Sequence, residues 1–456
     1  MAGIGFELRK LLERDSLLGM LQAYAYAGII SSGPWILSIL GILLIGVMSL
    51  TIVVPSILIT QFQVSVTYLI ACSLTLTGFA QLAFTRFCAD RLFEKKADII
   101  LPNFRGLSLL ITLLAGSLAL PVLYLGFRDT SEFYRLLMVA GFVIMCNIWI
   151  ATLFLSSMKQ YKSILLMFAL GYSMTVTLSL ALRHFKLEGL LSGFVLGHFI
   201  LLAGMILLIE HNFPSPQLLR FDFLKKQQIF ISLAAVGLFY NLGLWIDKFM
   251  FWMHPSTSVH VLGLLRASPI YDIPVFLAYL SIIPGMAVFL VKMETDFVEF
   301  YDAFYEAVRE GGSLEELEQL RNDIVFTVRQ GIYQIIKIQT ISALLILVVG
   351  RQLLHLLGIS ELYLPLLFVN LISAGLQVVF LGILNVFFYL DQRRMVLWLT
   401  VCFCLCNTLL TGLSLWLGPG WFGDGYAVSM LIAVALGFYL LTVKLDKLEY
   451  ETFMFQ

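Results

Sequence analysis

Long apolar runs make up most of this chain, and charges or clusters of Pro, Gly and Asn interrupt them at intervals. Between Asp15 and Arg86 there is no Asp, Glu, Lys or Arg. Such a stretch is long enough for two membrane-crossing helices, because each needs roughly 20 apolar residues. The pattern continues along the chain and predicts twelve spans, near residues 25–49, 64–84, 107–126, 136–156, 163–182, 190–209, 229–253, 273–291, 335–357, 366–390, 395–417 and 426–443.

The chain divides best at residues 210–228, where Pro214 and Pro216 interrupt helix and charges accumulate after six spans. In each half the largest charged connection follows the second span, at 85–106 and at 292–334. Two such halves suggest a parallel repeat, which in transporters encloses a path at its interface. Any twelve-span protein can also be cut in half, so both interpretations stay open. The predicted fold class is all-α, a polytopic membrane protein with twelve transmembrane helices in two six-helix lobes around a central cavity.

Both ends of the chain are predicted to lie in the cytoplasm. With that orientation the inner connections hold 21 basic residues and the outer ones only 6, which agrees with the excess of Lys and Arg on cytoplasmic loops. The expected parts are an amphipathic cytoplasmic helix at 1–19, an N-terminal lobe at 20–209, a cytoplasmic linker at 210–228, a C-terminal lobe at 229–443 and a cytoplasmic tail at 444–456.

The segment 292–334 is the only sizeable hydrophilic insert. Gly311 and Gly312 predict a turn, and Ser313 with Glu316 has the spacing of a capping box. We expect a cytoplasmic helical hairpin, which either docks a partner or is a solvated extension of its span.

Composition narrows the possible chemistry. The chain is 60% hydrophobic and 13% charged, and its six cysteines lie almost entirely in apolar segments, where they act as small hydrophobes. No phosphate-binding loop, zinc helix or nucleophile elbow is present. We therefore expect no enzyme activity, cofactor or metal. Asp272 and Asp424, at the outer edge, are the only obvious catalytic candidates.

Polar residues inside the spans mark helix faces that avoid lipid. In the first span, Ser31 and Ser32 precede Gly33 and Pro34, a combination that loosens a helix. It suits a water-lined cavity and close packing through small residues equally well. His198 follows Gly193 and Gly197, so a GxxxG helix contact with a packed histidine is favoured over a proton relay.

The seventh span contains two adjacent full charges, Asp247 and Lys248, in "YNLGLWIDKFMFWM". Neighbours on a helix point about 100° apart, so we expect different roles for them. Lys248 is predicted to snorkel toward the outer surface among Trp245 and Trp252. Asp247 is predicted to be a cavity acid and the only deep-set acid in the membrane region.

Three stretches closely resemble the PelG family, the inner-membrane transporters of the bacterial Pel exopolysaccharide system, and the likeness covers the whole chain. They are "MAGIGFELRKLLERDSLLGMLQAYAYAGIISSGPWI", "YNLGLWIDKFMFWM" and "IPGMAVFLVKMETDFVEFYDAFYEAV". The family is similar to the polysaccharide flippases of the multidrug/oligosaccharidyl-lipid/polysaccharide superfamily. The resemblance implies a cargo of amino-sugar-rich Pel polymer, with inner-membrane PelD and PelE and the cytoplasmic glycosyltransferase PelF as partners.

The first hypothesis is therefore a polysaccharide exporter of the bacterial inner membrane. Its substrate path is predicted to be lined from the first and seventh spans by Tyr24, Tyr26, Ser31, Ser32, Tyr240, Asn241, Trp245 and Asp247. Arg is missing from the spans except at their ends, which suits a cationic or neutral glycan. The alternatives are a cation-coupled small-molecule antiporter with Asp247 as proton carrier, and a scaffold that anchors a synthase through the 292–334 hairpin.

Overall fold

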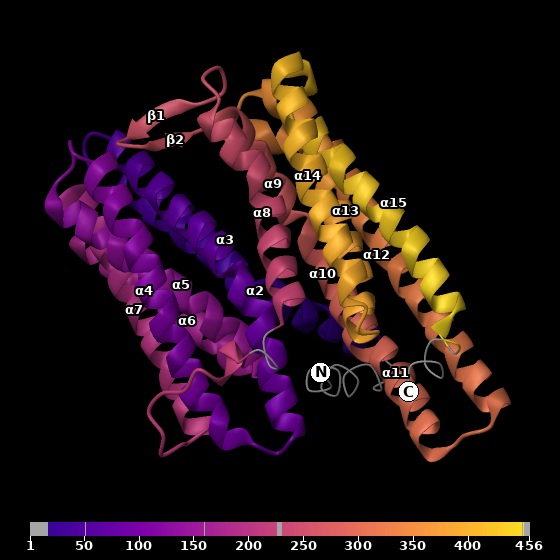
Figure 1. Ribbon diagram of the computed structural model, residues 1–456. Helices are drawn as coiled ribbons and strands as arrows, with labels where there is room; N and C mark the ends of the chain where they lie inside the picture. The colour runs from indigo at the N-terminus through magenta and orange to yellow at the C-terminus, as the bar shows by residue number, and fades with distance from the viewer. Residues whose placement is uncertain (1–16, 51, 159, 226–229, 449, 451–456) are drawn as a thin grey trace. The chain divides into compact units, whose positions relative to one another are not determined.

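A computed structural model describes residues 17–50, 52–158, 160–225, 230–448 and 450 (Figure 1). The described chain is mostly helical and divides into two compact units. The N-terminal unit comprises Gly33–Trp245 and Phe251–Ser268. The C-terminal unit comprises Met1–Ser32, Ile246–Met250 and Pro269–Gln456. The predicted surface helix at 1–19 falls almost entirely outside the described residues.

The N-terminal unit is a helix bundle with an aromatic core. Its elements are the second half of α2 (Leu17–Ser49), α3 (Ile57–Phe93), α4 (Ile100–Gly126), α5 (Glu132–Ser157), α6 (Tyr161–Leu182), α7 (Lys186–Asn212) and the first part of α8 (Ile231–Met253). Phe84, Phe104 and Phe154 from three helices meet with ring centroids 5.4–6.5 Å apart. Buried aromatics of this kind contribute large contact areas, so they fix how α3, α4 and α5 pack.

A short β-hairpin, which the hydropathy pattern did not predict, follows α8. β1 (Val259–Leu262) pairs antiparallel with β2 (Leu265–Ala267) in the register Val259↔Ala267. Gly263 supplies the positive φ of 54° in the turn. The hairpin is held on α3, because Gln61 donates to the Val261 carbonyl and Tyr68 to the Arg266 carbonyl.

Glycines let α6 and α7 approach closely as antiparallel neighbours. A Cβ at Gly193 would lie 2.2 Å from the Ser179 nitrogen, and one at Gly197 the same distance from Thr175 Oγ1. The predicted GxxxG contact is therefore confirmed. His198 is buried beside it, with Nδ1 2.9 Å from the Phe194 carbonyl and Nε2 3.3 Å from the Tyr172 hydroxyl.

The segment after α7 is anchored on the start of α4. Asn103 Nδ2 donates to Asp222 Oδ2 (3.1 Å), and the Asp222 backbone nitrogen donates to Asn103 Oδ1 (2.7 Å). Lys225 forms an ion pair with the same carboxylate. Partial burial by itself raises the pKa of Asp222, but the hydrogen bonds from Lys225 and Asn103 and the charges of Lys225 and Arg220 outweigh it, so the pKa is lowered.

The C-terminal unit is built around α13, which carries buried residues on several sides. Besides the first half of α2 and residues Ile246–Met250 of α8, its helices are α9 (Pro269–Leu280), α10 (Ile282–Val291), α11 (Phe297–Glu310), α12 (Leu314–Leu356), α13 (Leu364–Tyr389), α14 (Arg393–Leu417) and α15 (Asp424–Asp446). α9 and the helical stretch Ile282–Glu310, which begins with α10, meet at a bend of 40° and together are long and apolar enough to cross a membrane. A π-helical turn, Lys292–Asp296, continues α10 into α11.

The hydrophilic insert folds as α11 followed by the first turns of α12. Gly311 ends α11 with a left-handed φ of 78°, and Ser313 accepts a hydrogen bond from the Glu316 nitrogen at the start of α12. α12 then runs on without a break through the ninth predicted span. The second helix of the insert is therefore continuous with a membrane helix.

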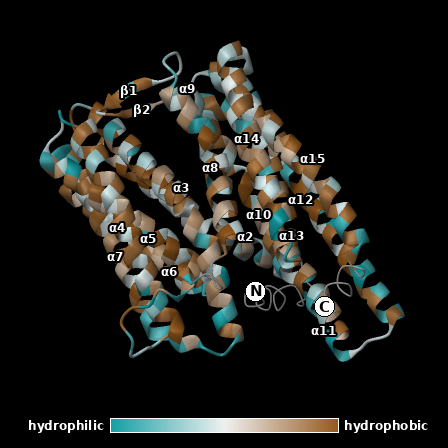
Figure 2. Cartoon of the chain, viewed as in Figure 1, coloured by the Kyte–Doolittle hydropathy of each residue, from teal (hydrophilic) through white to brown (hydrophobic). Residues whose placement is uncertain are grey.

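Each predicted span falls on a helix or on the bent α9–α10 pair. Among the described residues, eight helical stretches are long and apolar enough to cross a membrane, or ten with two bent pairs. One of the eight, Lys162–Asn212, contains both α6 and α7. α8 is 23 residues long, and Asp247 and Lys248 lower its hydropathy. Figure 2 shows hydrophobic residues along the helices and hydrophilic ones gathered at their ends.

Replacing Gly193 with Ala should destabilise the N-terminal unit, because the new Cβ meets backbone atoms of α6. We expect a loss of about 1–3 kcal/mol, as for other overpacked sites, measured as a lower midpoint of thermal unfolding in detergent. Gly116→Ala is the matched control, since a Cβ there has no atom within 4 Å. Equal midpoints for the two variants would contradict the close α6–α7 contact.

The Asp222 contacts should stabilise the protein in a pH-dependent way. Because folding lowers the pKa of this carboxyl from its ordinary value of 3.8, its contribution is complete above that value and is lost as pH falls through the native pKa. Asp222→Asn should therefore lower the unfolding midpoint at pH 7. Below about pH 4 the difference between the midpoints of the variant and wild type should become smaller. Unfolding midpoints measured from pH 3 to 7 check this, and a gap that is constant with pH would refute it.

Candidate functional site: a buried charged cluster in the C-terminal unit

The seventh predicted span, α8, places two opposite charges in a buried environment. Asp247 has 0% of its surface exposed and Lys248 has 5%. Both belong to the short part of α8, Ile246–Met250, that is grouped with the C-terminal unit. Two charges among apolar helices require partners, because uncompensated burial of an ion costs several kcal/mol.

The two side chains form a direct ion pair. Lys248 Nζ lies 3.1 Å from Asp247 Oδ2 and 3.3 Å from Oδ1. Tyr271, from α9, donates its hydroxyl to Asp247 Oδ2 at 2.6 Å. Both carboxylate oxygens thus accept hydrogen bonds inside the protein.

The lysine has further partners from α9 and α15. Its Nζ is 3.1 Å from the Tyr279 hydroxyl. It also lies 5.2 Å from the ring centroid of Tyr279 and 5.1 Å from that of Tyr426, within the range of cation–π attraction. Tyr426 in turn donates to Gln377 on α13 at 2.8 Å. The cluster therefore ties α8, α9, α13 and α15 together.

The predicted separation of Asp247 and Lys248 is wrong. The backbone does direct neighbouring residues about 100° apart, but the four-carbon stem of lysine lets its ammonium return to the carboxylate. Lys248 therefore stays buried and does not reach the surface by snorkelling. Tyr271, Tyr279 and Tyr426 could not be assigned to this site from sequence, because they come from other helices.

A second buried acid was also missed. Glu294, in the π-helical turn, is 9% exposed and accepts hydrogen bonds from Asn385 (3.1 Å) and Tyr389 (3.0 Å) of α13. Glu294 lies three residues beyond the predicted span 273–291, so the structure places a buried acid where the sequence analysis expected the cytoplasmic hairpin. Asn385 and Tyr389 are four residues apart and so lie on one face of α13. This spacing predicts that they share a partner, but it does not identify Glu294.

The other predicted path residues are divided between the two units. Ser32 and Asn241 are buried, whereas Tyr24, Tyr26, Ser31, Tyr240 and Trp245 are half-buried. Tyr24, Tyr26, Ser31 and Ser32 belong to the C-terminal unit, and Tyr240, Asn241 and Trp245 to the N-terminal unit. Ser31 donates to the Gly28 carbonyl one turn back.

Within the N-terminal unit, α8 crosses α3 at two glycines. A Cβ at Gly237 would lie 2.1 Å from the Gly78 carbonyl oxygen, and one at Gly78 would lie 2.7 Å from Asn241 Nδ2. Beyond this crossing, Trp252 stacks on Tyr68 at 4.5 Å and lies 6.4 Å from Trp245. Trp245 therefore borders an aromatic group of its own unit.

The cluster is electrically neutral and fully hydrogen-bonded at its carboxylate. It can fix the position of α8 against α9 and α15, and it needs no external ion to balance Asp247. Among the described residues, no group of three or more His, Cys, Asp or Glu is placed to hold a metal.

Solved structures of known proteins share this fold. One is a MOP superfamily transporter from Pyrococcus furiosus Vc1 (DSM3638), with 14% identity, TM-score 0.63 and coverage of 93% of this chain and 96% of that one. Another is a MATE transporter in the bent conformation, with 14% identity, TM-score 0.63 and 99% coverage of both chains. An outward-facing MATE multidrug transporter gives 13% identity, TM-score 0.60 and 94% and 96% coverage. The chain is a polytopic all-α membrane protein with the MOP transporter fold.

The sequence itself gives the family. Residues 1–453 match the model of PelG, described as "Putative exopolysaccharide Exporter (EPS-E)". This chain belongs to that family of exopolysaccharide exporters, as the sequence resemblance indicated. No curated protein matches the sequence significantly.

Removing one charge of the buried pair should destabilise the protein far more than removing both. Asp247→Asn leaves the lysine unpaired and Lys248→Met leaves the carboxylate unpaired, so we expect each to cost about 3–5 kcal/mol. The double variant should be more stable than either single one. Thermal unfolding in detergent measures this, with the exposed Lys447→Met as control. Additive losses in the double variant would show that the pair does not interact.

Proposed function

We propose that this exporter carries amino-sugar-rich Pel polymer across the bacterial inner membrane, with both termini in the cytoplasm. The observation that carries the proposal is the match to the exopolysaccharide exporter family over residues 1–453. The distribution of 21 inner against 6 outer basic residues supports the orientation. The lack of Arg in the predicted spans, except at their ends, supports a cargo that is neutral or cationic.

We propose that the substrate path uses residues of α2 and α8. Tyr24, Tyr26, Tyr240 and Trp245 are half-buried, so their rings keep surface for contact with sugars. Aromatic faces suit a polymer that has to slide, because stacking tolerates changes in register. Ser32, Asn241 and Asp247 are buried, and in this proposal they support the lining or become accessible during transport.

Cation-coupled antiport of small molecules is the alternative that shares the fold. It requires a carboxylate that exchanges a proton or metal ion with the solvent. Asp247 is instead paired with Lys248 and hydrogen-bonded to Tyr271. This pairing favours a structural role for the acid and weakens the antiporter hypothesis.

We further propose that the insert made of α11 and the start of α12 faces the other Pel proteins, PelD, PelE and the cytoplasmic glycosyltransferase PelF. α11 buries Phe297, Phe304 and Ala307 and exposes Glu299, Asp302 and Glu306. Exposed acids at this spacing lie near one face of a helix. A basic surface on a partner would complement them. In the scaffold alternative this docking is the whole function.

Export from a reconstituted system tests the path. Inverted vesicles that carry this protein and the partner proteins, supplied with sugar nucleotide on their outer, cytoplasmic face, should accumulate polymer in the lumen, where externally added glycoside hydrolase cannot degrade it. Trp245→Ala and Tyr240→Ala should each lower this protected polymer by about two- to tenfold, the equivalent of roughly 0.5–1.5 kcal/mol per aromatic contact. Trp398→Ala is the control, because Trp398 lies on α14 with 72% of its surface exposed.

The outcomes separate the hypotheses. Normal export by the α8 variants and by Asn241→Ala, at equal protein abundance, would refute the proposed lining. Failure of the wild-type protein to protect any polymer would refute export by this chain. Loss of synthase recruitment on deletion of residues 297–312, with no effect of the α8 variants, would support the scaffold alternative.

A further inference from the structure

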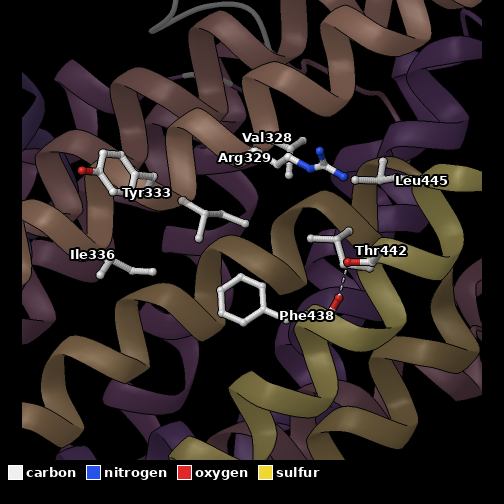
Figure 3. Close-up of a pocket in the computed structure, with 9 residues that line it drawn as sticks. Val328, Arg329, Tyr333, Ile336, Phe438, Thr442 and Leu445 are labelled. Atoms are coloured by element: carbon white, nitrogen blue, oxygen red, sulfur yellow. Dashed lines mark hydrogen bonds between the residues drawn. The ribbon is translucent and has the colours of Figure 1, made fainter.

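A groove of about 240 Å³ lies between α12 and α15 on the C-terminal unit (Figure 3). Its wall from α12 contains Val328, Ile332 and Ile336, and its wall from α15 contains Phe438 and Leu441. α13 packs against both of these helices, since Ile335 of α12 lies near Gly382 of α13 and Gly437 of α15 lies near Ile383 of α13. The groove is therefore an apolar slot that opens at the surface of the unit.

One charged side chain lines this apolar groove. Arg329 is exposed, and in Figure 3 its guanidinium extends from α12 toward Leu445 of α15. Within the described part of the chain, no hydrogen bond or ion pair involves the Arg329 side chain. Thr442, a polar side chain that also lines the groove, donates its hydroxyl to the Phe438 carbonyl at 3.0 Å, as the dashed line marks. The arginine donors are thus available to an anion.

The groove lies where both helices change from polar to apolar sequence. α12 begins with "LEELEQLRND" and becomes predominantly apolar over the residues that line the groove. α15 carries no charged residue between Asp424 and Lys444, and Asp446 and Lys447 follow at its end. Tyr333 and Tyr439 are 65% and 68% exposed at this level, and exposed tyrosines are typical of the boundary between hydrocarbon and headgroups.

The apolar side of α12 beyond the groove is exposed as well. Leu344, Leu345 and Val348 have 54%, 63% and 76% of their surfaces exposed, as expected for a helix in contact with lipid. The groove is thus continuous with a lipid-facing surface. Its volume is below the roughly 300–1,000 Å³ of enclosed small-molecule pockets, so it holds only part of a larger molecule.

We propose that this groove binds an anionic phospholipid, with the phosphate at Arg329 and the upper part of one acyl chain between α12 and α15. A guanidinium recognises phosphate oxygens through paired, charge-assisted hydrogen bonds. The apolar walls accept the chain, and the boundary position matches the headgroup and chain of a lipid at once. This lipid site is independent of the exported polymer and of its path.

Lipid binding to the purified full-length protein tests the site. Native mass spectrometry would measure the binding of phosphatidylglycerol and phosphatidylcholine to wild type, Arg329→Gln, Thr442→Trp and Arg351→Gln. We expect wild type to retain phosphatidylglycerol about fivefold more tightly than phosphatidylcholine, the gain of one basic residue at an anionic headgroup. Arg329→Gln should abolish this preference, and Thr442→Trp should displace both lipids by filling the groove.

Arg351→Gln is the matched control, because Arg351 lies at the other end of α12, where it pairs with Glu361 at 3.4 Å. It should bind lipid as wild type does. The preference for phosphatidylglycerol should also weaken at high salt, because salt screens exposed charges. Equal binding of the two lipids by wild type, or an unchanged preference in Arg329→Gln, would overturn the proposal. Cross-linking from position 442 to a partner's transmembrane helix rather than to lipid would do the same.

Discussion

A charge buried among apolar helices has to meet its counter-charge inside the protein, because neither lipid nor packed side chains solvate it. In this chain that constraint acts at Asp247 and Lys248. Their pairing brings hydroxyls and rings from α9 and α15 to one point on α8. The consecutive helices α8 and α9 and the distant helix α15 are thereby fixed in rotation as well as in position, which apolar packing alone does less specifically.

The helices of the N-terminal unit are held together in another way. Its helices approach through glycines, at Gly193 and Gly197 between α6 and α7 and at Gly78 and Gly237 between α3 and α8. Close backbone approach increases dispersion contact, which is important where lipid removes the hydrophobic driving force between helices. α8 thus uses glycine contact in its first half and charge pairing in its second.

The charged cluster on α8 has a consequence for an exporter of this family. A neutral, hydrogen-bonded cluster on α8 leaves no unbalanced carboxylate, so the helix can be held without a bound ion. The fold is that of the MOP transporters, but a shared fold accommodates different cargoes. In this chain the acid on α8 is paired with Lys248 inside the protein, and aromatic residues on α2 and α8 are half-buried.

The sequence by itself determined the helices, since hydropathy and the spacing of Ser313 and Glu316 are local properties of the chain. It also determined the family, through stretches that resemble PelG, and the glycine contact beside His198. Only the tertiary structure decided the site. Pairing of Asp247 with Lys248, its tyrosine partners and the burial of Glu294 depend on which helices become neighbours. Helix periodicity predicts which residues share a face of a helix, but not which other helix packs on that face. The long, flexible side chain of Lys248 also reaches Asp247 although the two backbone positions point in different directions.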